Sequence, residues 1–265
     1  MAIAATRPAA GNDLADLARE AVVAFDALLG DATAKVRERV VVEGHVVSRL
    51  LDRDQRAAHG LAWLATYVEA VRQLAGYAER MAGDRTFGEI EEHLVRIGIG
   101  EYIAQILGGI PMSQSEVVRP ADLGLTMAQV AARMTPAVEQ LVATGNTAER
   151  RARLVTLMRE SHGATIGVCG LDETLESIRE EMRKFADSEV IAHAQGWHRS
   201  NSYIPLEIIA QMSELGVFGL TIPEEFGGMG LGKESMCVVS EELSRGYIGV
   251  GSLGTRSEIA AELIL

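Results

Sequence analysis

The sequence predicts an all-α protein built from two helical bundles. Apolar residues recur three and four positions apart over most of the chain, which is the spacing of one face of a helix. No stretch alternates apolar and polar residues as a half-buried strand would, and no short tandem repeat occurs. Proline and glycine interrupt the apolar pattern at intervals and indicate separate helices.

Residues 1–170 contain several predicted helices. The first has an apolar stripe from residue 14 to residue 29 and ends near Gly30. A second stripe over residues 36–78 is long enough for a helical hairpin, with Gly44 and Gly60 as candidate breaks. Shorter helical stretches follow over residues 87–109, 126–134 and 147–160, separated by Pro111, Pro120 and Pro136.

The pattern is cleaner after residue 170. Residues 171–186 keep a regular apolar spacing, and Asp172 is placed to cap that helix with its side chain. Pro205 suits the first turn of the next helix. The stretch LGVFGLTIPEEFGGMGLG, from Leu215 to Gly232, then carries six glycines before helical spacing resumes at residues 233–246 and again towards residue 264.

Charge and composition limit the function classes. The formal net charge of −12 disfavours nucleic acid and anionic lipid surfaces as partners. Residues 171–265 carry 7 Lys or Arg against 16 Asp or Glu, whereas the preceding residues are nearly balanced. This shift predicts two domains, over residues 1–168 and 169–265.

Neither the cysteines nor the histidines form a recognisable site. Cys169 and Cys237 stand apart and outside any CxxC spacing, which is typical of free thiols in a cytoplasmic protein. The six histidines are scattered, so no metal site is predicted. No uncharged run approaches the roughly 20 residues of a membrane span. The sequence therefore predicts a cytoplasmic protein without a membrane span.

The segment GGMGLG is only superficially similar to a dinucleotide-binding loop. It follows a proline and two acids, Glu224 and Glu225, instead of a strand, and these acids would repel a pyrophosphate. Glycine also permits positive φ and close approach of neighbouring elements. The sequence therefore predicts a tight crossover between two helices.

Longer motifs in the same region carry a family resemblance. MSELGVFGLTIPEEFGGMGLG, followed by SEELSRGYIGVGSL, resembles the N-terminal helical domain of acyl-CoA dehydrogenases, and the likeness runs from Leu171 to Leu265. It implies an acyl-CoA substrate, FAD as cofactor and electron-transfer flavoprotein as acceptor. In that family the FAD-contacting β-domain and the catalytic glutamate lie in later domains. We therefore expect this chain to be part of a longer enzyme and inactive alone, with the catalytic base outside it.

A second resemblance lies in the first bundle. YIAQILGG is similar to the Gln-Ile-Leu-Gly-Gly motif of the family's C-terminal helical domain, which implies a vestigial flavin contact at Gln105, Gly108 and Gly109. The residues that follow depart from the family pattern, so this bundle is interpreted as a degenerate copy. This order, with a helical bundle ahead of an N-terminal-type domain, resembles that of family members that carry a long N-terminal helical extension. It implies a homodimer in which the extension fills the place of a second dimer.

The resemblance also implies a substrate pocket at the start of the last helix, lined by Gly251, Ser252, Thr255 and Arg256. A fatty acyl chain would leave a buried guanidinium unpaired, whereas a dicarboxylyl-CoA would pair with Arg256. Alternatively, Arg256 faces solvent or pairs with Glu258 or Glu262. For the whole chain, the alternative function is a non-catalytic helical interaction protein derived from the family.

Overall fold

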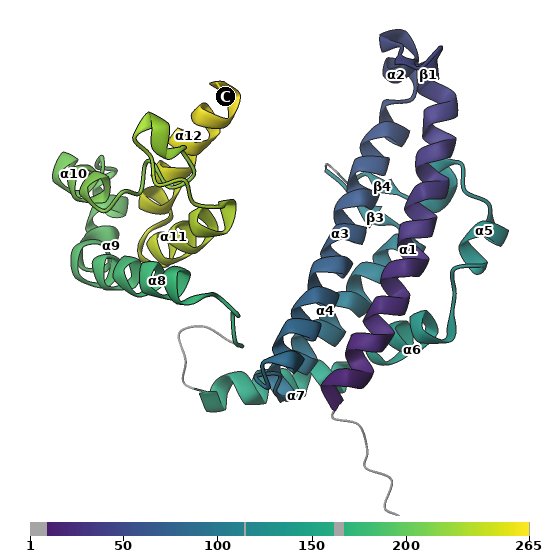
Figure 1. Cartoon of the computed structure of the whole chain (residues 1–265), viewed down its shortest axis with the longest axis horizontal. Helices are drawn as coiled ribbons and strands as arrows, with labels where there is room; N and C mark the ends of the chain where they lie inside the picture. The colour runs from purple at the N-terminus through teal and green to yellow at the C-terminus, as the bar shows by residue number, and fades with distance from the viewer. Residues whose placement is uncertain (1–9, 114, 162–166, 265) are drawn as a thin grey trace, which may run out of the picture. The chain divides into compact units, whose positions relative to one another are not determined.

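The computed structural model describes residues 10–113, 115–161 and 167–264, which are mostly helical (Figure 1). The predicted all-α fold class is confirmed. By its internal contacts the chain divides into two compact units, Met1–Gly170 and Leu171–Leu265. The sequence prediction placed the division after residue 168. None of the helices in the described ranges is long and apolar enough to cross a membrane.

The first unit is a helical bundle with two short hairpins. Its elements are α1 (Ala10–Val40), β1 (Val41–Val42), β2 (His45–Val46), α2 (Ser48–Arg53), α3 (Gln55–Gly83), α4 (Glu89–Gly108), β3 (Ile110–Pro111), β4 (Val117–Val118), η1 (Pro120–Leu123), α5 (Met127–Ala131), α6 (Pro136–Thr144) and α7 (Ala148–Ser161).

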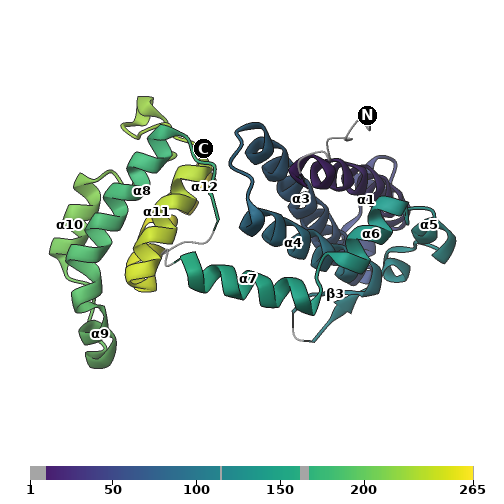
Figure 2. The ribbon, with the colours of Figure 1, turned by 90° about the horizontal axis from the view of Figure 1, so that it is seen from below.

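Three long helices form the centre of this unit. Both views show α1 beside α3 and α3 beside α4 (Figures 1 and 2). Their facing sides bury Phe25, Leu64 and Ile99 almost completely. Since each of these side chains contributes about 1.5–3 kcal/mol when removed from water, the helix stripes fix how the helices pack.

Two predicted helix breaks are wrong. Gly30 lies inside α1, because Ala32, Val36 and Val40 continue the buried stripe and outweigh the roughly 1 kcal/mol that a helical glycine costs. Gly60 lies inside α3, where a Cβ would clash with the side chain of Val118. Gly60 therefore allows the β3–β4 hairpin to approach α3.

The predicted break at Gly44 is confirmed. This residue occupies the β1–β2 turn with φ of +84°. Such a φ suits glycine, which has no Cβ to clash with the backbone. The hairpin is only two residues long on each side, which is too short for an alternating strand pattern to be visible in the sequence.

A short segment at the end of the first unit is held against α3 and α4. The Val168 carbonyl accepts a hydrogen bond from the Tyr77 hydroxyl, and the Val168 amide donates to Glu91 Oε1 at 2.9 Å. Burial, followed by the charge of Glu91, raises the pKa of Tyr77 to about 12. The Tyr77 hydroxyl therefore stays a donor at any physiological pH.

The second unit has its own core. Its elements are α8 (Glu173–Phe185), the π-helical turn η2 (Ala186–Val190), α9 (Ile191–Ser200), α10 (Leu206–Glu214), η3 (Glu224–Phe226), α11 (Lys233–Gly246) and α12 (Ile248–Ile264). α11 packs against both α8 and α12. Met212 and Leu243 are fully buried at the centre. Asp172 caps α8 as predicted, because its Oδ1 accepts from the Leu175 amide at 2.8 Å.

A buried carboxylate joins α8 to α11. Glu242 is 1% exposed and accepts hydrogen bonds from Arg183 Nε at 3.1 Å and from Arg245 Nε at 3.0 Å. Burial alone raises the pKa of Glu242, but the hydrogen bonds and charges of the two arginines together outweigh it. The pKa therefore lies below its ordinary value.

The glycine-rich stretch between α10 and α11 is a closed loop. Leu231 N donates to Leu220 O at 2.8 Å, and Met229 N donates to Gly219 O at 2.8 Å. A Cβ at Gly228 would clash with Ile222, so the chain crosses itself closely there. These hydrogen bonds close the loop on itself, so it is the tight crossover that the sequence predicts.

Candidate functional site

The predicted substrate-pocket residues lie together in the first half of α12. Gly251 is buried, and an added Cβ would lie 2.7 Å from the Ser244 amide nitrogen of α11. An added Cβ at Gly254 would lie 3.0 Å from Val217 Cγ1. These two glycines let α12 approach its neighbours closely. Close packing against α11 inside the unit thus explains why residue 251 is a glycine.

The hydroxyl groups beside Gly251 bond to their own helix. Ser252 Oγ donates to Gly249 O at 3.1 Å, and Thr255 Oγ1 donates to Ser252 O at 2.9 Å. Each hydroxyl has a single hydrogen and has already donated it, so it can only accept a hydrogen bond from a ligand. A carboxylate ligand would need its donor from another group.

Arg256 is the cation of this segment. It is exposed and has no ion pair or hydrogen bond with any residue that the structure describes. Of the two acids considered as partners, Glu258 points into the unit and is 2% exposed, and the side chain of Glu262 lies outside the described residues. The guanidinium is therefore available as a donor next to Ser252 and Thr255.

The predicted flavin-contact residues lie in the first unit, at the end of α4. Gln105 Oε1 accepts from the Tyr67 hydroxyl at 2.7 Å, and Gln105 Nε2 donates to Glu101 Oε1 at 2.6 Å. Burial, then Tyr102 and Glu101, raise the pKa of Tyr67, so its hydroxyl remains a donor. The partner Tyr67 is 38 residues away in sequence, so no local signal reveals this bond.

The two glycines after Gln105 differ in their surroundings. Gly108 has no described heavy atom within 4 Å of an added Cβ. Gly109 has φ of +138°, and an added Cβ would lie 2.5 Å from Val117 Cγ1. Gly109 is therefore required by the turn into the β3–β4 hairpin. Most of the hydrogen-bonding capacity of the Gln105 side chain is therefore engaged inside the first unit.

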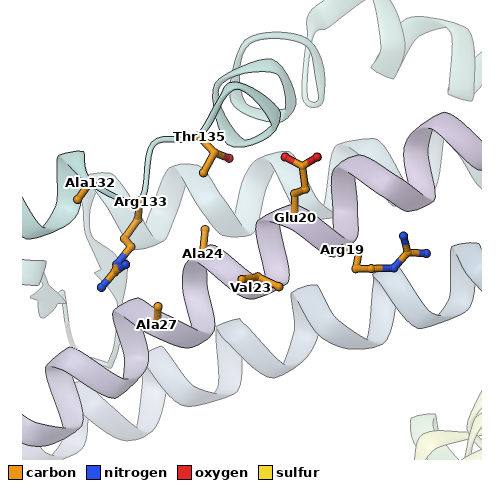
Figure 3. Close-up of a pocket in the computed structure, with 8 residues that line it drawn as sticks. All are labelled: Arg19, Glu20, Val23, Ala24, Ala27, Ala132, Arg133 and Thr135. Atoms are coloured by element: carbon orange, nitrogen blue, oxygen red, sulfur yellow. The ribbon is translucent and has the colours of Figure 1, made fainter.

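A groove of about 370 Å³ lies elsewhere in the first unit (Figure 3). Arg133 and Arg19 lie at its opposite ends, with the small side chains of Val23, Ala24 and Ala27 between them. Both arginines are already paired, Arg133 with Asp31 and Arg19 with Asp16 and Glu79. The groove contains none of the predicted site residues.

No group of three or more potential metal ligands occurs within the described ranges.

Comparison with known proteins assigns the second unit. The family described as acyl-CoA dehydrogenase, N-terminal domain, matches residues 172–265. Residues 172–265 belong to the acyl-CoA dehydrogenase family. This agrees with the closed glycine loop and the all-α packing of α8 to α12, and it confirms the resemblance that the sequence motifs indicate.

One of the relatives found matches both units. A (2S)-methylsuccinyl-CoA dehydrogenase of Cereibacter sphaeroides is 56% identical over 255 residues, which is 96% of this chain and 46% of the relative. An isovaleryl-CoA dehydrogenase of Oryza sativa subsp. japonica is 38% identical over 90 residues, and a glutaryl-CoA dehydrogenase of Desulfococcus multivorans is 36% identical over 78 residues. Those alignments cover 33% and 29% of this chain and 22% and 20% of the relatives. The chain thus spans less than half the length of each.

Proposed function

We propose that this chain is part of a flavin-dependent acyl-CoA dehydrogenase that converts (2S)-methylsuccinyl-CoA to mesaconyl-CoA. The 56% identity to a dehydrogenase of that substrate is the observation that supports the proposal, since it extends over the first unit as well as the second. The isovaleryl-CoA and glutaryl-CoA enzymes match only about a third of this chain.

In such an enzyme FAD accepts the hydride removed from the β-carbon. Among this chain's own residues, we assign substrate contact to the Gly251–Arg256 segment of α12, and the catalytic base to polypeptide outside the chain. Electron-transfer flavoprotein as acceptor, a homodimer and a cytoplasmic location belong to the same proposal. The acidic net charge of −12 is consistent with a partner other than nucleic acid.

The proposed role of Arg256 is to bind the free carboxylate of the acyl group. The Ser252 and Thr255 hydroxyls already donate their hydrogens to backbone carbonyls of α12. The guanidinium of Arg256 is therefore the side-chain donor that this segment offers to a carboxylate. Loss of one partner of a desolvated charge pair costs about 2–5 kcal/mol. Arg256 is thus proposed to select dicarboxylyl over neutral acyl chains.

The test uses the full reading frame, purified with its flavin. Anaerobic addition of methylsuccinyl-CoA is expected to reduce the flavin, and Arg256→Leu is expected to lower kcat/KM for this substrate by at least about 30-fold, which corresponds to about 2 kcal/mol. With a neutral branched acyl-CoA, the same variant should stay within about threefold of wild type. If the purified protein held no flavin and showed no flavin reduction, the alternative function as a non-catalytic helical interaction protein would be favoured. If Arg256→Leu lowered kcat/KM equally for both substrates, the proposed role of Arg256 would be ruled out.

Gln105 provides a separate prediction. We propose that it stabilises the first unit and has lost its flavin contact. Gln105→Ala removes the partners of Tyr67 and Glu101, so the free energy of unfolding should fall by about 1–2 kcal/mol while the flavin-to-protein ratio stays unchanged.

Tyr67→Phe is the matched control for Gln105→Ala. It removes only the hydroxyl and should give a smaller loss of stability in the same direction. If Gln105→Ala released flavin without a loss of stability, Gln105 would be a flavin contact after all.

A further inference from the structure

The junction between α11 and α12 places an aromatic ring beside the proposed substrate segment. Tyr247 is the extended residue that ends α11, and its carbonyl accepts the first hydrogen bonds of α12, from Val250 N at 2.9 Å and from Gly251 N at 3.1 Å. An added Cβ at Gly249 would lie 2.8 Å from Tyr247 Cε1. The ring therefore lies directly against the first turn of α12, in the space that a side chain at residue 249 would occupy.

The Tyr247 ring is supported by a second aromatic side chain. Its centroid lies 6.1 Å from that of Trp197 in α9, and the two ring planes are inclined by 53°. Trp197 is in turn stacked on His193, at 5.8 Å between centroids and 29° between planes. Trp197 and Tyr247 both pack against the core of the second unit. Since aromatic pairs prefer defined relative orientations, these neighbours fix the position of the Tyr247 ring.

Gly249 and Arg256 lie on one face of α12. Two residues seven positions apart in a helix differ by about 20° around the axis and by about 10 Å along it. Ser252 lies between them, and its hydroxyl donates to the Gly249 carbonyl at 3.1 Å. This face, which we call the α12 face, therefore has the Tyr247 ring at its N-terminal end and the Arg256 guanidinium about two turns further on.

The two ends of the α12 face differ in chemistry. Arg256 is exposed and has no ion pair or hydrogen bond among the described residues, so it can donate to a carboxylate. At the other end, the Tyr247 ring and the bare backbone of Gly249 offer apolar contact to a hydrocarbon chain. Because the ring is held from behind by Trp197, a chain that extends past Gly249 would meet it.

We propose that Tyr247 is a specificity-determining residue, whose ring forms the end wall of the α12 face and excludes dicarboxylyl groups too long to fit between the ring and Arg256. The assignment rests on the proposed function, since it takes the Gly251–Arg256 segment as the substrate contact. In this arrangement the guanidinium selects the acyl group by its charge, and the ring selects it by its length.

Tyr247→Ala tests the end wall in the full reading frame, purified with its flavin. Apolar pockets discriminate between chains that differ by one methylene by roughly 10–200-fold. We therefore expect Tyr247→Ala to lower the preference for methylsuccinyl-CoA over a dicarboxylyl-CoA one methylene longer by at least about tenfold. The preference is measured as the ratio of the two kcat/KM values. Tyr247→Phe keeps the ring and should restore the wild-type ratio.

Tyr203→Ala is the matched control for Tyr247→Ala. It also removes a tyrosine ring from the second unit, but Tyr203 is 97% exposed and lies before α10. This variant should leave the ratio of the two kcat/KM values within about threefold of wild type. A ratio in Tyr247→Ala that stayed equally close to wild type would overturn the end wall.

Trp197 supplies a readout that does not need turnover. Its indole lies against the Tyr247 ring, so a ligand that contacts this ring should change its fluorescence. The flavin is reduced beforehand, and methylsuccinyl-CoA is then titrated into the wild type and into Trp197→Phe. We expect a saturable change in emission that Trp197→Phe abolishes. Tyr247→Ala should raise the concentration of half-saturation by at least about threefold.

The two readouts separate this proposal from the proposed function. If the wild type did not oxidise methylsuccinyl-CoA but gave the Trp197 signal with its dependence on Tyr247, the α12 face would bind the acyl group and the proposed reaction would fail. If the wild type were active but Tyr247→Ala changed neither the ratio nor the titration, the reaction would stand and the end wall would be overturned. Absence of both activity and signal would overturn both.

Discussion

Replacing Glu242 by glutamine is expected to lower the free energy of unfolding of the second unit by about 2–3 kcal/mol at pH 7. The carboxylate is 1% exposed and accepts three hydrogen bonds, two from Arg183 and one from Arg245. The amide keeps only one acceptor oxygen and turns a donor towards a guanidinium. Urea unfolding followed by circular dichroism measures the change. Glu241→Gln, at the exposed neighbouring position, should leave stability within about 0.5 kcal/mol of wild type.

The same variant should also change the pH dependence of stability. The pKa of Glu242 is lower in the folded state than its ordinary value of 4.5, so the unfolded state binds the proton more readily. The stability that Glu242 contributes is fully present above about pH 4.5 and is lost as pH falls through the folded pKa. Glu242→Gln should therefore reduce the fall in the free energy of unfolding below about pH 4.5. If the pH dependence of the variant were the same as that of wild type, Glu242 would not titrate as inferred.

Replacing Gly251 by alanine is expected to destabilise the second unit by about 1–3 kcal/mol. The new Cβ would lie 2.7 Å from the Ser244 amide nitrogen, which belongs to the backbone of α11 and cannot rotate away. The helices would have to move apart, which weakens the packing of Val250 and Leu243. Thermal unfolding of residues 1–265 measures the effect without requiring activity.

Gly196→Ala is the matched control for Gly251→Ala. Gly196 also lies inside a helix of the second unit, α9, but an added Cβ has no described heavy atom within 4 Å. Alanine there should raise stability by about 0.5–1 kcal/mol, because glycine is the poorer helix former. If both variants behaved alike, backbone propensity and not the contact with Ser244 would determine the result.

The fold was predictable where the controlling interactions are local. The sequence predicts a helix over residues 233–246, and α11 has these bounds. The Asp172 cap joins two residues that are three positions apart in the sequence. Gly60 is wrong as a break because the buried stripe of α3 runs through it, and the reason for a glycine there, the side chain of Val118, lies 58 residues away. A single glycine does not end α1, because the buried stripe continues past Gly30 to Val40.

The site was less predictable than the fold. The motifs identified the family of the second unit, and that family is shown by the match to residues 172–265. The positions of Gln105 and Arg256 followed from resemblance, but their bonding depends on tertiary contacts. Tyr67 engages Gln105, whereas Arg256 meets no described partner. Both assignments stay predictions that the variants above test.

The closed glycine loop has a consequence for the order of folding. Its two long-range bonds, Met229 N to Gly219 O and Leu231 N to Leu220 O, join residues only about ten positions apart. A loop of that length closes within about 10–100 ns and loses little chain entropy. The crossover can therefore form while α10 and α11 are still separate.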